Sequence, residues 1–356
     1  MILPHLIVIE CFMDPLSQGL VGVTAAQTVS TKKEIAAASM LGFFSGMAAD
    51  LDIFIHSDVD PLLFLEYHRQ FTHSIIFMPI GGLICAIVFY LLFKVFSRNS
   101  NLSFSRIYLF SFAGYATHGF LDACTSYGTQ LFWPFSTERF AWNNISIIDP
   151  LFTIPLLIII NIALFKRSQF FSYLAAIFAI SYLSLGLAQE YRAKQVAQTL
   201  AESRGHTAID LSVKPSFMNL IVWKSIYEYQ GRYYVDAIRV FDDSGFYLGD
   251  SIEKLDVTRD FPWLNSSAQQ AIDIERFAWF SSDYLAVDVT NPNRIIDMRY
   301  SLLPNKLDGL WGIELSQTAK PSTHIKWTTN RQNGDRQQNI KNLWSMILGV
   351  NVLTID

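Results

Sequence analysis

Long apolar stretches lie in the first half of the chain, whereas the second half mixes apolar and polar residues at short intervals. A helix needs about 20 largely apolar residues to cross a hydrocarbon core of ~30 Å. Residues 72–96, 147–165 and 170–187 are close to or above this length, and the apolar stretch 107–121 is shorter. The pattern predicts membrane-spanning helices in the first half.

Two further stretches, residues 16–29 and 35–49, are short and rich in Gly, Ala and Ser. Small residues allow helices to approach closely in a bilayer, so these stretches predict packed spans rather than lipid-facing ones. The expected fold therefore begins with a multi-pass α-helical membrane domain of about six helices, four of which come from the more apolar stretches.

The second half has the pattern of a soluble α+β domain. Residues 192–203 predict a helix, and the polar stretch 318–339 predicts a loop. Four short runs rich in aromatic and β-branched residues predict strands. These runs are residues 232–241, 277–289, 294–302 and 310–315.

The composition supports three segments: an N-terminal lead (residues 1–12), a membrane domain (13–190) and a soluble domain (191–356). Only 16% of the 356 residues are charged, against about 25% in soluble domains. Residues 1–189 hold 20 charged side chains and residues 190–356 hold 38. The net charge of −4 gives no reason to expect nucleic acid as a partner. The lead lacks the basic region of a signal peptide and is either an upstream start or a short unstructured segment.

Most basic residues of the first half fall in loops that six spans would place on one face. The positive-inside rule makes this face cytoplasmic. The soluble domain and the loops 50–72 and 122–146 are then expected on the outer face of the membrane, which we expect to be a bacterial inner membrane. The basic residues concerned are Lys32, Lys33, Lys94, Arg98, Arg106, Lys166 and Arg167.

Acidic and histidine side chains gather at the predicted span ends on the outer face. Ionisable groups at membrane depth cost at least a few kcal/mol unless they are paired, solvated or bound to metal. A cluster of them on one face therefore favours a metal site over several separate helix caps. The candidate ligands are Asp50, Asp52, His68, His73, His118 and Asp122.

The spacing of these candidates predicts how they meet. His118 and Asp122 are four residues apart, so on a helix both side chains project from one face. Asp50 and Asp52 are two residues apart and would diverge on an unbroken helix. They converge only if the helix ends or unwinds at this point.

Helix ends also place the remaining candidates. Thr72 is a candidate N-cap for the following span, which would leave His68 in the preceding loop and His73 in the first helical turn. Asp149 precedes a proline and predicts an N-cap of a later span, with a supporting role at the site as the second interpretation. Gln18, in a helix of small residues, either caps or points into the site.

Mixed imidazole and carboxylate ligands suit zinc, iron or manganese rather than a thiolate site. One zinc ion takes three or four protein ligands, whereas six ligands indicate two ions. A two-metal site activates water and clamps both oxygens of a phosphoester displacement. Arg69, beside the site, is placed to neutralise a phosphate. Asp52 is the candidate that would act as a general base instead of a ligand.

The order and spacing of five motifs resemble the YdjM-like family of membrane-bound metal-dependent hydrolases. The resemblance covers residues 13–190, and the later residues are similar to the extension of longer members. One departure is Ala49, where the family commonly has proline before the acidic pair. The motifs are MDPLSQGLVG, GFFSGMAADLD, HRQFTHSIIF, THGFLDACTSYGTQLFWPFS and IIDPLF.

The resemblance implies an integral membrane protein whose motif Asp and His residues hold metal, with distant kinship to the zinc phospholipase C and single-strand nuclease superfamily. We expect a hydrolase that uses one or two divalent ions, zinc first, on a phosphoester or lipid-like substrate at the membrane surface. Its expected partners are the lipid bilayer and that substrate. The alternative is a non-catalytic, membrane-anchored binding or regulatory protein with a structural polar or metal cluster. A proton-relaying transporter is disfavoured because the polar groups gather at one face rather than at the midplane.

Overall fold

The chain divides into two compact units. The computed structural model describes residues 14–96, 102–242, 244–329 and 336–354. The expected lead of residues 1–12 therefore lies outside the described residues. The first unit contains the described residues up to Ile55 together with Tyr67–Leu187. The second contains His56–Glu66 and the described residues from Ala188 onward.

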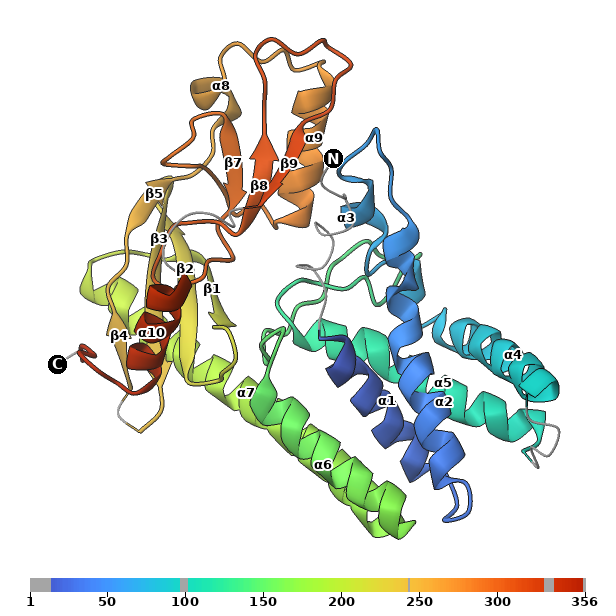
Figure 1. The fold of residues 1–356 in the computed structure, drawn as a ribbon. Helices are drawn as coiled ribbons and strands as arrows, with labels where there is room; N and C mark the ends of the chain where they lie inside the picture. The colour runs from blue at the N-terminus through green and yellow to red at the C-terminus, as the bar shows by residue number, and fades with distance from the viewer. Residues whose placement is uncertain (1–13, 97–101, 243, 330–335, 355–356) are drawn as a thin grey trace. The chain divides into compact units, whose positions relative to one another are not determined.

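The N-terminal half of the chain is helical (Figure 1). Two 3₁₀ helices and one short α-helix lie between its longer helices. The longer helices are α1 (Pro15–Thr28), α2 (Ile35–Met47), α4 (Met78–Phe96), α5 (Phe104–Cys124), α6 (Pro150–Lys166) and α7 (Gln169–Ser203). The short elements are η3 (Ala48–Phe54), α3 (Leu63–Tyr67) and η4 (Phe71–His73).

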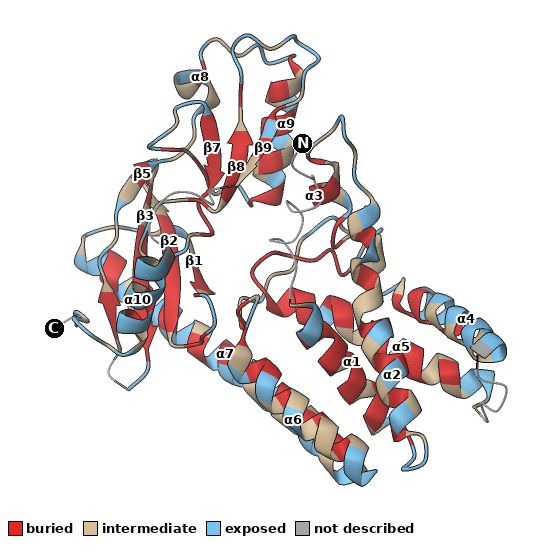
Figure 2. Cartoon of the chain, viewed as in Figure 1, coloured by how far each residue is buried: buried red, intermediate tan, exposed pale blue. Residues whose placement is uncertain are grey.

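Three helical segments are long and apolar enough to cross a membrane: Ile35–Phe54, Ile75–Val95 and Gln169–Ser203. Helix α6 is a shorter apolar helix. The outward faces of α4, α6 and α7 are largely exposed in Figure 2, although they carry apolar side chains. Exposed apolar faces of this extent are typical of contact with lipid or a partner. A helical region with candidate membrane spans is confirmed, whereas the expected count of about six spans is not.

Small residues allow α1 and α2 to pack closely, as the sequence predicts, and α5 packs against them in the same way. A Cβ atom added to Gly22 of α1 would collide with the backbone carbonyl of Gly42 in α2. A Cβ atom on Gly114 of α5 would come within 2.6 Å of the same Gly42 oxygen. The three helices therefore pack around glycines that a larger residue could not replace without moving the backbone.

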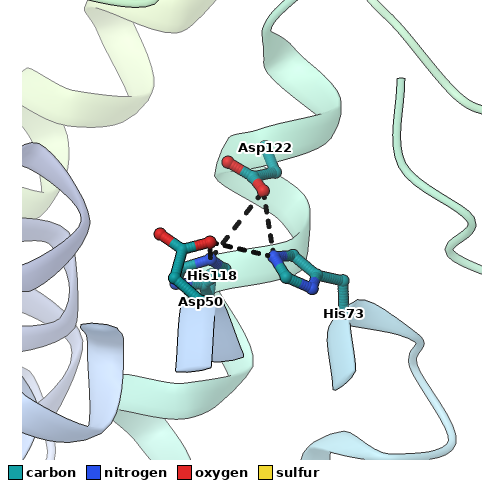
Figure 3. Close-up of side chains that lie close together, drawn as sticks. All are labelled: Asp50, His73, His118 and Asp122. Carbon is teal, nitrogen blue, oxygen red and sulfur yellow. Dashed lines mark hydrogen bonds and ion pairs between the residues drawn. The ribbon is translucent and has the colours of Figure 1, made fainter. Parts of the chain in front are cut away.

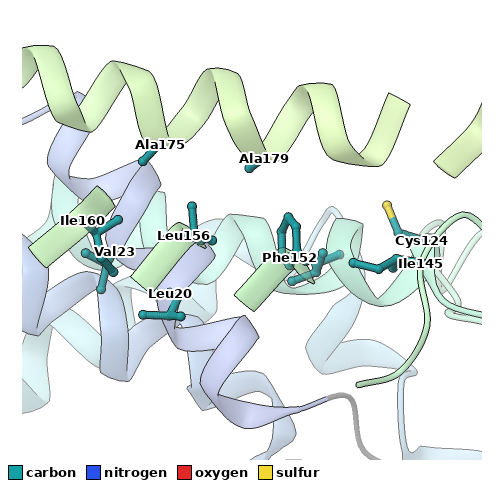
Figure 4. Close-up of a cluster of buried hydrophobic side chains, with 10 residues drawn as sticks. Leu20, Val23, Cys124, Ile145, Phe152, Leu156, Ile160, Ala175 and Ala179 are labelled. Carbon is teal, nitrogen blue, oxygen red and sulfur yellow. The ribbon is translucent and has the colours of Figure 1, made fainter. Parts of the chain in front are cut away.

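Helices α6 and α7 complete the first unit by packing apolar side chains against α1 (Figure 4). Phe152, Leu156 and Ile160 of α6 form a buried cluster with Ala175 and Ala179 of α7. The same cluster includes residues of α1 and the end of α5. The position of α1 is thus fixed on one side by glycine contacts and on another by this apolar core.

Side-chain contacts place the start of α5 and the start of α7 beside the loop between α1 and α2. Arg106 of α5 makes an ion pair of 2.6 Å with Glu34, which immediately precedes α2. The Gln169 side chain of α7 donates a hydrogen bond of 2.6 Å to the Ser30 carbonyl. Three regions with basic residues therefore lie together at this end of the helical unit. They are the loop between α1 and α2, the start of α5, and the connection between α6 and α7.

The second unit contains two antiparallel sheets, so a sheet-containing C-terminal domain is confirmed. The five-stranded sheet has the order β1-β2-β3-β4, with β5 paired to β3, and the other has the order β6-β7-β8-β9. The strands of the first sheet are β1 (Ile209–Pro215), β2 (Val222–Tyr229), β3 (Arg232–Val240), β4 (Ser244–Tyr247) and β5 (Ser251–Glu253). Those of the second are β6 (Leu285–Val287), β7 (Arg294–Asp297), β8 (Trp311–Glu314) and β9 (Lys326–Thr329).

The two sheets share one apolar core. Ile226 and Val235 of the first sheet pack with Ala286 and Ile296 of the second. Figure 2 shows the central strands β2 and β3 buried along most of their length. The helices of this region are α8 (Val257–Asp260), α9 (Gln269–Phe280) and α10 (Arg336–Ile347).

Two expectations for the second unit were wrong. The run 277–289 was expected as a strand, but its first four residues end helix α9 and only Leu285–Val287 is a strand. Ile274, Phe277 and Phe280 are buried at helical spacing, so the tertiary core outweighs the β preference of the aromatic residues. The stretch 318–339 was expected as a loop, yet it contains β9, whose residues pair with β8.

Candidate metal centre

The candidate site lies where α2 and α5 end, at the opposite end of these helices from Glu34 and Arg106. Helix α2 stops at Met47 and continues as the 3₁₀ helix η3, which carries both Asp50 and Asp52. The predicted unwinding of the helix at this acidic pair is therefore confirmed. With about three residues per turn, positions two apart on a 3₁₀ helix point in different directions. The two carboxylates accordingly have different neighbours.

Asp50, His73, His118 and Asp122 direct their side chains toward one point (Figure 3). His118 and Asp122 come from one face of α5, as their spacing predicts, and His73 ends η4. The His73 Nε2 atom lies 3.4 Å from Asp50 Oδ1 and 3.1 Å from Asp122 Oδ2. The His118 Nε2 atom lies 3.1 Å and 3.8 Å from the same two oxygens. Four potential ligand atoms thus surround one small space.

These separations fit a tetrahedral metal ion. Ligand bonds of about 2.0–2.1 Å in tetrahedral geometry put neighbouring ligand atoms about 3.4 Å apart. The four measured separations range from 3.1 to 3.8 Å. His73 Nε2 is buried and makes no hydrogen bond within the described residues, which is the condition expected of an atom that binds an ion. Asp122 Oδ2 makes no hydrogen bond there either, although it has an ion-pair partner in Arg69 Nε at 3.0 Å.

Hydrogen bonds at the opposite ring nitrogens orient both histidines. His118 Nδ1 lies 2.5 Å from the Gly46 carbonyl oxygen, which only accepts, so Nδ1 carries the proton. His73 Nδ1 lies 3.3 Å from the Asp52 carboxylate, which favours a proton there as well. Each Nε2 atom therefore presents its lone pair to the centre. Outer partners of this kind are characteristic of metal-binding histidines.

Asp52 joins the second group of candidates. One of its oxygens contacts His68 Nδ1 at 2.8 Å. The other accepts hydrogen bonds from the Thr72 hydroxyl at 2.7 Å and the Arg69 backbone N–H at 3.2 Å. Asp50, Asp52 and His68 form a second set whose ligand atoms are mutually close. All six predicted ligands are thus brought together, in two groups that share Asp50.

Arg69 is buried beside the centre and makes specific contacts. Its Nε atom lies 3.0 Å from Asp122 Oδ2, and its Nη1 atom donates to the Thr125 hydroxyl at 2.9 Å. Its backbone adopts a left-handed conformation with φ of 63°, which is uncommon for a residue other than glycine. Local backbone strain of this type is concentrated at functional sites.

Two of the weaker sequence interpretations are resolved. The Gln18 side chain of α1 donates a hydrogen bond of 2.7 Å to Asp122 Oδ1, so it points into the site. Asp149 accepts from the Leu151 backbone N–H at 3.1 Å as the N-cap of α6, which confirms the first interpretation. The expected N-cap at Thr72 was wrong, because α4 begins only at Met78 and the Thr72 hydroxyl is bonded to Asp52.

Three contacts at the site escaped the sequence analysis: the Gly46 carbonyl, the Thr125 hydroxyl and the Tyr127 ring. The Arg69 guanidinium carbon lies 4.9 Å from the centre of the Tyr127 ring. Thr125 and Tyr127 belong to the segment that follows Asp122 in the sequence, THGFLDACTSYG. Their position within that motif was the sequence signal that could have identified them as site residues.

The helical fold with candidate spans and the His/Asp cluster define an integral membrane protein with a possible metal centre. The chain belongs to the YdjM inner membrane protein family, whose model matches residues 13–193. It is also similar to the "Uncharacterized protein YfhP" of Bacillus subtilis (strain 168), with 25% identity over 291 residues. That similarity covers 78% of this chain and 82% of the relative. Comparison with solved structures gives no match.

Proposed function

We propose that this protein is a metal-dependent hydrolase that holds one divalent ion, zinc first, through Asp50, His73, His118 and Asp122. The observation that carries the proposal is the convergence of four ligand atoms, with the protons of both histidines turned outward. Two imidazoles and two carboxylates form a set that suits zinc, iron or manganese. The second group, which includes His68, is the candidate for a second ion.

Charge balance favours one ion. Asp50, Asp52 and Asp122 bring three negative charges together, and the Arg69 guanidinium provides one positive charge. A net charge of −2 in a largely buried cluster is costly without a counter-ion. One divalent cation cancels this charge, whereas a second would leave the cluster with a net charge of +2.

The proposed reaction is hydrolysis of a phosphoester at the membrane surface, with the bilayer and a small or lipid-like phosphoester as partners. When bound, the ion supplies activation of water and stabilisation of charge on the phosphoryl group. Asp52 lies 2.8 Å from His68 Nδ1 and 3.3 Å from His73 Nδ1, and we propose it as the proton acceptor of the reaction. The buried Nη2 atom of Arg69 makes no hydrogen bond within the described residues, and we propose it as the donor to a phosphate oxygen.

A structural metal site is the second candidate function, and burial is the observation that favours it. The side chains of His73, His118 and Asp122 are at most 1% exposed, and only Asp50, at 16%, reaches the surface. Structural sites are closed, whereas catalytic sites keep a position open for water or substrate. Under this alternative the protein binds metal but hydrolyses nothing.

The test is to purify the full chain in detergent and measure both bound metal and hydrolysis of phosphoester probes. We expect about one equivalent of metal and measurable hydrolysis in the wild type, and loss of both in His118→Ala. The matched control is His56→Ala, because His56 is an exposed histidine in the loop that follows η3. Less than half an equivalent of metal in the wild type would overturn the proposal. Full metal content without hydrolysis would favour the structural alternative.

We further propose that the site and the C-terminal domain face outward. The support is the positive-inside rule applied to the seven basic residues, together with the contacts that bring Glu34, Arg106, Ser30 and Gln169 to the end opposite Asp50. An alkaline phosphatase fusion at the C-terminus tests this orientation. We expect an active fusion, and activity only from a cytoplasmic reporter at that position would contradict the proposal.

A further inference from the structure

An open apolar groove of about 360 Å³ runs between three helices of the first unit. Helix α1 forms its floor, with Leu16, Leu20 and Val23, and α2 and α6 form its walls. Its volume lies in the range of small-molecule sites, ~300–1,000 Å³. The rim is exposed at Met40 and Phe44 of α2, by 38% and 53%. The wall helix α2 belongs to the candidate span Ile35–Phe54.

One end of the groove lies at the level of the metal centre. Leu16, at that end, is two residues from Gln18, whose side chain donates to Asp122. On the wall, Phe43 is three residues from Gly46, whose carbonyl contacts His118. On both α1 and α2, the residues that line this end of the groove are thus within one helical turn of the residues that contact the site.

The groove has the length of one leaflet. Its floor residues extend from Leu16 to Gln27, a rise of about 16 Å at ~1.5 Å per residue. The hydrocarbon core of a bilayer is ~30 Å thick, so this is about half of its depth. A lipid with its head group at the level of the site would therefore have a hydrocarbon chain at the depth of the groove.

The few polar side chains in the groove are already bonded within the protein. Gln27 donates to the Ser39 hydroxyl at 2.9 Å, and Ser39 donates to the Ile35 carbonyl at 2.6 Å. Asn161 of α6 donates to the Leu157 carbonyl at 2.7 Å. A hydrocarbon occupant breaks none of these bonds, so its burial carries no polar penalty. The lining therefore selects an apolar chain rather than a polar ligand.

We infer that this groove holds one hydrocarbon chain of a membrane lipid whose phosphoester head group lies at the metal centre. The inference rests on the proposed function and narrows the substrate to a lipid phosphoester of the leaflet on the site's side of the membrane. In the hydrolysis the oxygen of water bonds to phosphorus while the P–O bond to the alcohol oxygen of the lipid breaks. That oxygen takes the proton lost by the water, so the lipid alcohol keeps its chain in the groove and the phosphate is released. The groove sets the preference for long-chain over water-soluble substrates.

The test uses the full chain in nanodiscs of phosphatidylethanolamine and phosphatidylglycerol that contain phosphatidic acid with a photoactivatable diazirine in its acyl chain. After illumination, cross-linked peptides are mapped by mass spectrometry. Hydrolysis of long-chain and dihexanoyl phosphatidic acid is measured in parallel. Met40→Trp fills the groove, and Leu91→Trp is the matched control because Leu91 is 55% exposed on α4 and does not line the groove.

We expect cross-links concentrated on α1, α2 and α6 in the wild type and in Leu91→Trp. Met40→Trp should lower cross-linking and long-chain hydrolysis about tenfold, equivalent to ~1.4 kcal/mol, with unchanged metal content and unchanged dihexanoyl hydrolysis. Equal cross-linking of α4 and the groove, or equal loss on both substrates, would overturn the inference. Concentrated cross-links without hydrolysis of either substrate would support the lipid site and refute the proposed function, so the two failures are distinguishable.

Discussion

Two clusters of histidine and acidic side chains, one in each unit, have similar composition but opposite geometry. In the second unit, Arg276 of α9 binds Asp60 through Nη2 at 2.8 Å, Glu66 through Nε at 2.5 Å and Asp273 through Nη1 at 3.0 Å. His324 Nδ1 lies 2.9 Å from Asp273. Each of these carboxylates is thus met by at least one cationic or imidazole group.

In the first unit the lone pairs, rather than the protons, point toward the centre. His73 and His118 turn their Nδ1 protons toward Asp52 and the Gly46 carbonyl, and their Nε2 atoms face Asp50 and Asp122. The comparison teaches that residue types alone do not separate an ion-pair network from a metal centre. The direction in which donors and acceptors point differs between the two clusters, and its consequence for metal binding can be tested.

Metal removal should produce the largest difference between the two clusters. A ligand present at 1,000 times its dissociation constant stabilises the folded state by ~4 kcal/mol. Cys124 is buried two residues after Asp122, and no cysteine lies beyond residue 124. Chelation should therefore raise maleimide labelling of Cys124 by on the order of a thousandfold, with reversal by added zinc. Peptide-resolved labelling distinguishes Cys124 from Cys11 and Cys85. Unchanged labelling of Cys124 would mean that no ion is bound at this cluster.

Removal of the arginine should have the next largest effect, confined to the second unit. Arg276→Ala leaves the fully buried Asp273 without its guanidinium, and breaking such a buried pair costs ~3 kcal/mol. Six of the eight tryptophans lie beyond residue 187, so urea unfolding followed by fluorescence reports on this unit. The control is Arg259→Ala, because its ion pair with Glu253 is exposed and contributes little to stability.

The metal content of Arg276→Ala is the discriminating measurement. We expect it to equal that of the wild type, because Asp60, Glu66 and Asp273 are bonded to arginine and are not among the six candidate ligands. If Arg276→Ala lost its metal, the two clusters could not be treated as independent. If it unfolded at the same urea concentration as Arg259→Ala, the ion pairs of Arg276 would not contribute measurably to the stability of the second unit.

The sequence predicted those parts of the site that depend on local geometry. His118 and Asp122 share a face of α5 because four residues make about one helical turn. The unwinding at Asp50 and Asp52 was predicted because only a helix end lets such a pair serve one site. The absence of proline at Ala49 did not prevent it.

The parts that depend on distant contacts could not be predicted from the sequence. The hydrogen bond from Gln18 to Asp122 joins residues 104 positions apart, and the Arg276–Asp60 contact joins residues 216 apart. The Thr72 cap failed because Asp52, far along the chain, provides a better acceptor for its hydroxyl. The aromatic run at Phe277 was predicted as a strand from the β preference of its residues. That local preference contains no information about the core against which α9 packs.

Lys214 provides the prediction with the smallest expected effect. It is a buried cationic side chain of the second unit, like Arg276, but within the described residues it is not surrounded by several carboxylates. It lies directly across from Lys224 on the paired strands β1 and β2. Burial, with Arg299 and Lys224 as cationic neighbours, lowers the pKa of the Lys214 ammonium to about 7. Lys224 is lowered to a pKa of about 7 as well, chiefly by burial, although it donates to the Ser301 hydroxyl at 2.8 Å.

A lowered lysine pKa fixes the sign of the pH dependence. Between about pH 7 and the ordinary lysine value of 10.5, the unfolded chain binds more protons than the folded one, so stability rises with pH. Lys214→Met keeps the apolar stem and removes the buried ammonium, which should stabilise the second unit by ~1–2 kcal/mol at pH 7. The urea concentration at the midpoint of unfolding should also rise less between pH 7 and pH 9 in this variant than in the wild type. The exposed Lys320→Met is the control, and a variant less stable than wild type at pH 7 would show that the Lys214 ammonium is favourably paired.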